Sequence, residues 1–181
     1  IYNTKNRGRA FTMLRHPVER AVSMYLHLTK NKHPLVSKMT LEDYVQSAHV
    51  ENNWMVRFLT GTMSGVVNES HLSQAKEILR SRVVIGLLEE KETSMQRFEY
   101  YFGWSYKKDP KKQKECRRKI LVGDFRSNEM AKTKIKENSQ AWTMLMWQNK
   151  LDMKLYKFAQ HLFLVQGAEL FSDMQVAPSV L

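Results

Sequence analysis

The segment 11–25, with the sequence FTMLRHPVERAVSMY, places the tightest limits on how this chain can fold. Residues 11–14 form a brief apolar run of the kind that fills the interior of a sheet. Pro17 suits the first turn of a helix, where a backbone N–H has no partner within the helix. Glu19 follows near the positive end of that helix, where a negative charge is favoured. The segment therefore predicts a short buried strand, a tight turn and a helix.

The predicted helix has two different faces. Arg20, Ser23 and His27 lie at positions i, i+3 and i+7 and share one face. A second face, expected to pack on the sheet, carries the apolar residues Val18, Val22 and Tyr25. Arg15 lies at the carboxyl end of the strand, outside which ligands bind in open α/β sheets. An arginine and a hydroxyl at a helix start suit a phosphate, but an ordinary helix with a solvated basic side explains the spacing equally well.

A second strand and helix repeat this order. Residues 83–88, VVIGLL, are continuously apolar, which is typical of a parallel strand covered on both faces. A helix is expected to follow over 90–102, and further helical patterns occur over 70–82 and from residue 139 onward. We therefore expect a helix-rich α/β fold with a parallel sheet flanked by helices, and the length of 181 residues predicts a single domain.

Local signals predict several helix ends and contacts. Thr40 followed by Asp43 resembles a capping box at the start of a short helix. In a further predicted helix over 52–59, Trp54 and Phe58 are four residues apart and are expected to face inward together. Arg57 in the same helix would contact an anion or form a salt bridge, and we favour the salt bridge.

Other signals concern the second half of the chain. Ser70 is expected to cap the helix that runs to residue 82. Gly167 is expected to end the last helix, so that residues 167–181 form a flexible tail. The segment 104–124 is dense in Lys and Arg and predicts a basic loop or insertion, either an acceptor-binding edge or, as we favour, a solvated loop.

Residues 14–25 read Leu-Arg-His-Pro, two residues, Arg, two residues and Ser-Met-Tyr. This pattern resembles the 3′-phosphate-binding segment of the PAPS-dependent sulfotransferases and is closest to their membrane-associated carbohydrate branch. The resemblance implies that Arg15 and Ser23 hold the 3′-phosphate of 3′-phosphoadenosine 5′-phosphosulfate (PAPS), the sulfonate donor. Arg20 matches the same motif and joins the expected cofactor-binding residues, with a structural role as its alternative.

Three more segments are similar to the family and occur in the same order. Residues 53–61 match a family segment of the form Asn-x-x-x-Arg-x-Leu-x-Gly. Residues 75–89 resemble the family's helix, strand and Gly-containing turn, and residues 149–163 resemble its C-terminal helix. The implied architecture is the P-loop-NTPase-like sulfotransferase fold. The family's Pro-Lys-x-Gly-x-Thr-like loop for the 5′-phosphosulfate does not occur in the sequence. We therefore expect residues 1–181 to be a partial, N-terminally truncated sulfotransferase domain.

The implied activity is transfer of a sulfonate group from PAPS to a hydroxyl of a carbohydrate. The catalytic base is expected upstream, near the phosphosulfate loop. No motif singles out any of the six histidines, so we assign no catalytic residue; they are His16, His27, His33, His49, His71 and His161. No pair of His or Cys has metal-ligand spacing, and we expect no metal.

The formal net charge of +11, from 29 Lys and Arg against 18 Asp and Glu, favours anionic partners. We expect an anionic carbohydrate or glycan as the acceptor, and we do not expect nucleic acid as a partner. The family implies a Golgi-lumen location and a membrane anchor N-terminal to this chain, in which no apolar run approaches the ~20 residues of a membrane helix. The alternative function is a non-catalytic basic module that binds polyanions. The oligomeric state is left open.

Two further features bear on the cellular compartment. Asn68-Glu69-Ser70 is an N-glycosylation sequon, which supports a secretory location only weakly because short sequons arise by chance. Cys116 is the single cysteine, which excludes an internal disulfide pair, and we expect a free thiol.

Overall fold

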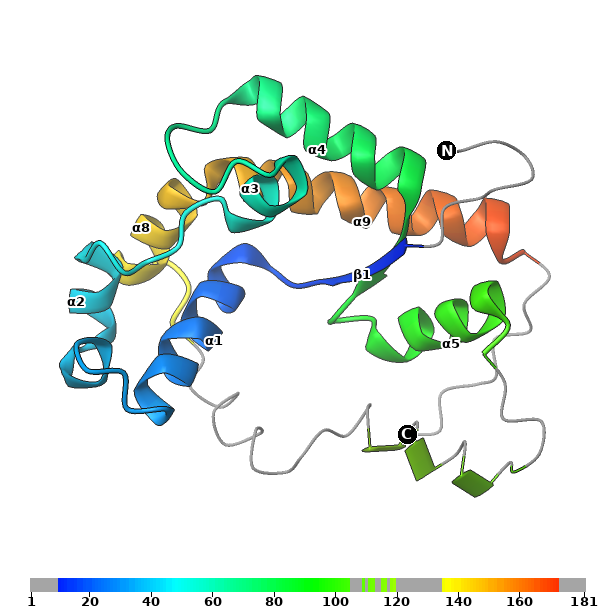
Figure 1. Cartoon of the computed structure of the whole chain (residues 1–181), viewed down its shortest axis with the longest axis horizontal. Helices are drawn as coiled ribbons and strands as arrows, with labels where there is room; N and C mark the ends of the chain where they lie inside the picture. The colour runs from blue at the N-terminus through cyan, green and yellow to red at the C-terminus, as the bar shows by residue number, and fades with distance from the viewer. Residues whose placement is uncertain are drawn as a thin grey trace. The chain divides into compact units, whose positions relative to one another are not determined.

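The structure, a computed structural model, describes residues 10–104, 109, 111–112, 115–116, 118–119 and 135–172. Its elements, in chain order, are β1 (Ala10–Leu14), α1 (Pro17–Lys30), a 3₁₀ helix (Val36–Lys38), α2 (Leu41–Gln46), α3 (Trp54–Thr60), α4 (Glu69–Arg82), β2 (Val83–Leu87), α5 (Lys91–Phe102), α8 (Gln140–Gln148) and α9 (Lys150–Leu170) (Figure 1). The expected α/β, helix-rich fold with a parallel sheet is therefore confirmed, and among the described residues the sheet has two strands.

The two strands pair in parallel, with Ala10 opposite Val83 and Leu14 opposite Leu87. Every residue of β2 is buried, as its continuous apolar sequence predicts. β1 is covered less completely, because Leu14 is buried while the side chain of Phe11 is 47% exposed. The prediction of a buried strand is thus wrong for Phe11, whose ring lies at the surface against aromatic rings of α5 and the residues after it.

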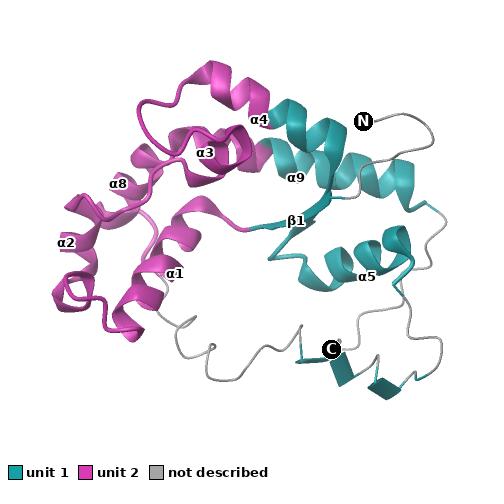
Figure 2. Ribbon diagram, in the orientation of Figure 1, with its two compact units in different colours: residues 1–14, 76–122, 158–181 teal, residues 15–75, 123–157 magenta. Residues whose placement is uncertain are grey.

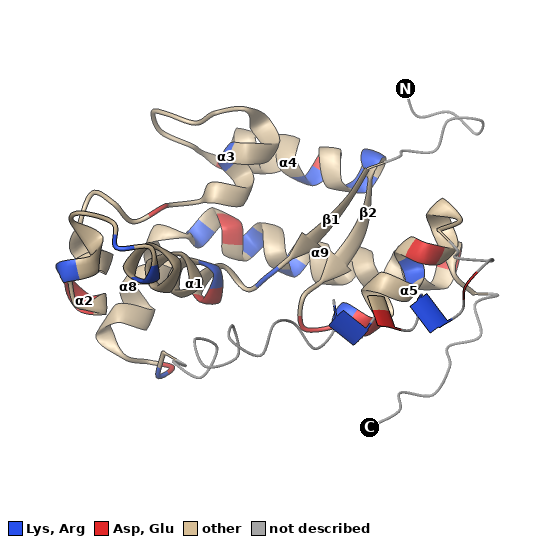
Figure 3. Cartoon of the chain, turned by 60° about the horizontal axis from the view of Figure 1, so that its bottom comes forward, with Lys and Arg blue, Asp and Glu red and all other residues tan. Residues whose placement is uncertain are grey.

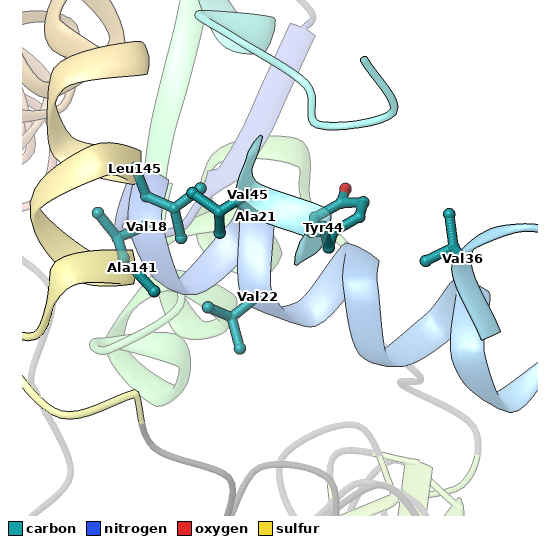
Figure 4. Close-up of a cluster of buried hydrophobic side chains, with 8 residues drawn as sticks. All are labelled: Val18, Ala21, Val22, Val36, Tyr44, Val45, Ala141 and Leu145. Carbon is teal, nitrogen blue, oxygen red and sulfur yellow. The ribbon is translucent and has the colours of Figure 1, made fainter. Parts of the chain in front are cut away.

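The chain forms two compact units, which Figure 2 colours separately. Unit 1 comprises residues 1–14, 76–122 and 158–181, and unit 2 comprises residues 15–75 and 123–157. Val84, Phe98 and Phe171 form a buried apolar cluster in unit 1. The buried cluster of unit 2 joins α1, the 3₁₀ helix, α2 and α8, and its members are Val18, Ala21, Val22, Val36, Tyr44, Val45, Ala141 and Leu145 (Figure 4).

The predicted inner face of α1 is confirmed in this cluster. Val18 and Val22 are buried, and Tyr25 is half-buried with its hydroxyl donating to the carbonyl oxygen of Met39 at 2.9 Å. Pro17 occupies the first turn, as expected. The α1 helix is thereby fixed by one apolar side, which leaves its opposite side available to solvent.

Two helix starts test the capping predictions. The capping box of α2 is confirmed: the Asp43 N–H donates to the Thr40 hydroxyl, and the Thr40 N–H donates to the Asp43 carboxylate. At α4 the expected Ser70 cap is wrong. Asn68 is the capping residue, because its Oδ1 accepts from the N–H groups of Ser70 and His71. Asn and Ser cap helices about equally well, so the local sequence does not decide between them.

The predicted inward pair on α3 is also wrong in part. Trp54 and Phe58 share a face, but their rings stack on each other with centroids 4.9 Å apart, and Phe58 is 61% exposed. Met55 and Val56 are the buried residues of this short helix. The four-residue spacing identified the shared face correctly but not the direction in which it points.

The last helix passes through its predicted stop. α9 runs beyond Gly167 to Leu170, and Phe171 is buried after it, so residues 167–171 do not belong to a tail. A side chain at position 167 would collide with the guanidinium group of Arg97, which stacks on the Phe163 ring and donates to its carbonyl oxygen at 2.6 Å. Gly167 therefore lies inside α9, where the guanidinium group of Arg97 packs closely against it. The predicted tail over 173–181 lies outside the described residues.

Most of the basic segment 104–124 also lies outside the described residues. Those that are described between 111 and 119 have helical backbone and exposed side chains; they are Lys111, Lys112, Glu115, Cys116, Arg118 and Lys119. Lys112 pairs with Asp109, and Lys119 pairs with Glu115. The roles predicted for the whole segment stay predictions.

Gln166 of α9 bonds to the backbone of β2 as a neighbouring strand would. Its amide Nε2 donates to the carbonyl oxygen of Val83 at 2.8 Å, and its Oε1 accepts from the N–H of Ile85 at 2.9 Å. The hydroxyl of Ser94 on α5 accepts from the N–H of Leu87 at 2.9 Å. Two side chains thus satisfy buried backbone groups that would otherwise lack partners.

We expect Gln166→Leu to lower the free energy of unfolding by about 2 to 5 kcal/mol, because two buried backbone groups would lose their hydrogen bonds. Gln160→Leu is the matched control, since Gln160 lies on the same helix and makes an exposed bond to Glu89. We expect the control to change stability by less than about 0.5 kcal/mol in chemical denaturation. Equal losses in the two variants would contradict the role assigned to Gln166.

Candidate functional site

Arg15 directly follows β1 and precedes α1, as the sequence predicts. Its side chain is 32% exposed, and its Nε donates to the Glu19 carboxylate at 3.1 Å. This ion pair connects Arg15, which precedes the helix, to Glu19 in the first turn of α1. The sequence predicts a favourable position for Glu19 at the helix start but does not predict this ion pair. The structure therefore gives Arg15 an anionic neighbour from its own chain.

Ser23 lies on the exposed side of α1, and its side chain is open to solvent. It follows Glu19 by four residues, so these two residues share one side of α1. His27 continues this side by a further turn, and both of its ring nitrogens face the side-chain amide of Asn31. Ser23 thus lies on the side of α1 that carries Glu19, the ion-pair partner of Arg15.

Arg20, the third expected ligand residue, lies in different surroundings. Its Nη1 donates to the Glu51 carboxylate at 2.8 Å, and its guanidinium carbon lies 4.8 Å from the centre of the Trp54 ring. The side chain is only 18% exposed. These contacts connect α1 to the segment before α3 and to α3 itself. They favour the structural alternative for Arg20 over contact with a ligand.

His16 sits at the N-cap position of α1. Its ring stacks on Trp142 of α8, with centroids 5.4 Å apart, and meets the edge of the Tyr156 ring of α9 at 5.8 Å. The packing of His16 between two aromatic rings gives it a role in holding the start of α1. His16 and Pro17 together fix the backbone that follows Arg15.

In the segment 53–61, which matches the second family motif, Arg57 and Gly61 have structural roles. The Arg57 side chain donates to the carbonyl oxygens of Asn52, Thr62 and Gly65, and thereby holds the chain on both sides of α3. The expected salt bridge of Arg57 is therefore wrong, because its partners are neutral oxygens. Gly61 ends α3 with a φ of 69°, a left-handed conformation that favours glycine.

Asn53 and Asp152 cap each other's helices. Asn53 precedes α3, and its Oδ1 accepts from the N–H groups of Leu151 and Asp152 at the start of α9, at 2.9 and 3.2 Å. The Asp152 carboxylate accepts from the N–H groups of Met55 and Val56 at the start of α3, both at 2.9 Å. The capping role of Asp152 is not predictable from the sequence, because its partners lie 96 and 97 residues away.

Burial decides the titration of Asp152. Removal from water raises the pKa of Asp152 to about 6, against the lowering effects of its two backbone hydrogen bonds and of the charges of Arg20 and Arg57. The side chain of Asn149 extends the same buried group, since its Oδ1 accepts from the N–H of Asn53 at 3.0 Å. This polar cluster is enclosed and already bonded internally, which makes it a structural centre rather than a ligand site.

The α1 helix carries both signs of charge (Figure 3): Glu19 is acidic, and Arg20 and Lys30 are basic. Within the described ranges, no group of three or more His, Cys, Asp or Glu side chains could hold a metal ion.

Among the same described residues, no helix has the length and the apolar content needed to span a membrane.

Comparison with known proteins returned no similarity that could assign a family: no family model matches the chain, and neither a curated protein nor a solved structure matches it. The site must therefore be interpreted from its own residues and geometry.

We expect the pKa of Asp152 to make this carboxyl a source of instability as pH rises. Between about pH 4 and 6 the unfolded chain binds fewer protons here than the folded chain, so the free energy of unfolding falls as pH increases through that window. The stability of the wild type relative to Asp152→Asn should fall by up to about 3 kcal/mol and then level off above pH 6. Denaturant unfolding at several pH values measures the difference.

Asp43→Asn is the matched control, because Asp43 is also a helix-capping carboxylate. Hydrogen bonds to Thr40 hold the pKa of Asp43 below its ordinary value of 3.8. The sign is therefore opposite: the stabilising effect of Asp43 is present above pH 3.8 and is lost as pH falls further. The interpretation of Asp152 fails if both variants show the same direction of change.

Proposed function

We propose that this chain carries the 3′-phosphate-binding part of a PAPS-dependent carbohydrate sulfotransferase and has the P-loop-NTPase-like fold of that family. One observation carries the proposal: the Leu-Arg-His-Pro…Arg…Ser pattern lies on a parallel strand, a short connection and a helix. Arg15 is in the connection with a partly exposed guanidinium, and Ser23 is exposed on the helix.

The chemistry of the two residues suits a phosphate monoester. A guanidinium group offers paired N–H donors with the geometry of two phosphate oxygens, and a serine hydroxyl offers a further donor. The positive end of the α1 helix adds a favourable field for an anion. A 3′-phosphate distinguishes PAPS from nucleotides of the ADP type, so these contacts would select the donor.

Transfer of a sulfonate group also needs groups that this sequence does not supply. The donor must be held in line with the acceptor, and the acceptor hydroxyl must lose its proton. In our proposal Arg15 and Ser23 bind and orient one end of the donor, while Arg20 and His16 hold the helix that carries them. No residue of this chain is proposed as the base.

The remaining parts of the proposal concern the setting of the reaction. The net charge of +11 supports an anionic glycan acceptor, and the similarity to the carbohydrate branch supports the Golgi lumen and an N-terminal membrane anchor. The same net charge also supports the second candidate function, a non-catalytic module that binds polyanions. The two candidates differ in whether binding depends on the position of a phosphate.

Calorimetric titration with 3′,5′-ADP and with 5′-AMP tests this difference. We expect tighter binding of 3′,5′-ADP, weakened roughly 10- to 100-fold in Arg15→Ala and to a smaller extent in Ser23→Ala, because charged hydrogen bonds are stronger than neutral ones. Arg80→Ala is the control, since Arg80 also pairs with a nearby glutamate, Glu77, on an exposed helix surface. Equal and salt-sensitive binding of both nucleotides would instead favour the polyanion module.

Glu19 gives a second test of the same site. Its carboxylate lies beside Arg15 and would compete with a bound phosphate, so we expect Glu19→Gln to tighten binding of 3′,5′-ADP roughly two- to fivefold. Glu77→Gln removes the corresponding partner of Arg80 and should leave the affinity unchanged. Weaker binding after Glu19→Gln would show that the phosphate does not approach Arg15 from this side.

A further inference from the structure

The sequon Asn68-Glu69-Ser70 occurs once in the chain and is not used by the proposed donor site. It lies where the loop after α3 meets the start of α4, and all three residues are exposed. The loop before it carries two exposed apolar residues, Met63 at 63% and Val66 at 86%. The sequon is therefore accessible in the folded chain and adjoins apolar surface that a hydrophilic glycan could cover.

The hydrogen bonds of Asn68 fix which end of its amide remains available. Oδ1 accepts from the N–H of Ser70 at 3.1 Å and from the N–H of His71 at 3.3 Å, and it caps α4 in doing so. These backbone donors require an oxygen, so the amide nitrogen Nδ2 points away from the helix start. N-linked glycosylation modifies Nδ2 and leaves the carbonyl oxygen in place, so the helix cap and the modification are compatible.

The charge of the middle residue of the sequon is offset by an ion pair. Glu69 is acidic, but its carboxylate pairs with Lys154 in unit 2, which offsets its charge in the folded chain. The neighbourhood of Asn68 is thus neither buried nor strongly charged.

We infer that Asn68 is the acceptor of an N-linked oligosaccharide. The transfer forms a bond from Nδ2 to the anomeric carbon of a lipid-diphosphate-linked oligosaccharide and breaks the bond from that carbon to the phosphate oxygen. The amide nitrogen loses one proton, and the lipid diphosphate leaves. This inference rests on the luminal location in the proposed function but not on binding of PAPS.

The test is translation of the chain, behind a cleavable secretory signal, into microsomes that contain the oligosaccharide donor. Only protease-protected, translocated chains are scored. We expect a single glycan that peptide N-glycosidase removes, leaving Asp at position 68 in the peptide mass spectrum. Ser70→Ala should abolish the glycan while keeping the Asn68 cap, since the cap uses the backbone N–H of Ser70. Ser73→Ala, an exposed serine of the same helix, should keep the glycan.

An internal standard makes a negative result decisive. Gln140→Thr creates a second sequon at Asn138, which is exposed before α8. Chains of this variant that carry a glycan at Asn138 have met the transferase, so an unmodified Asn68 in those chains overturns the inference. Nucleotide titration of unglycosylated protein reports on the donor site separately. A glycan at Asn68 together with no preference for 3′,5′-ADP would support the glycan site and contradict the proposed function.

Discussion

The exchange of helix caps between Asn53 and Asp152 is the constraint on which unit 2 depends most. Every helix begins with N–H groups that lack partners within the helix, and burying them unpaired is costly. Here the starts of α3 and α9 are both buried, and each is satisfied by a side chain from beside the other. The bonds therefore fix the separation and orientation of the two helix starts together. Asn53 adopts a positive φ of 47° to reach this position.

The helix that carries the candidate site is held by several different interactions. Val18 and Val22 anchor one side of α1 in the apolar cluster, and Arg20 connects it to Glu51 and Trp54. The sequence motif thus combines two kinds of residue: some hold the helix, and Arg15 and Ser23 remain accessible on it. Arg20 matches the same motif, and its contacts with Glu51 and Trp54 favour the structural alternative for this residue.

The sequence predicts what local chemistry decides. Continuous apolar character identified β2 as a parallel strand, Pro17 marked the start of α1, and Thr40 with Asp43 defined a capping box. Several failures share one cause, which is that a distant partner decides the outcome. Gly167 lies inside α9 with the guanidinium group of Arg97 packed against it, and Asp152 matters because of N–H groups far away in sequence. In the candidate site, position was predictable from spacing, but the partners of Arg15 and Arg20 were not.

The side-chain amide of Gln166 also has a consequence for solubility. An uncovered strand edge is a template on which another molecule can add a strand and begin aggregation. Because Gln166 occupies the backbone groups of Val83 and Ile85, a strand from a neighbouring molecule cannot pair along this edge of β2 without first displacing the amide. A single buried glutamine thereby hinders strand addition at this edge of β2, a strand in which every residue is buried.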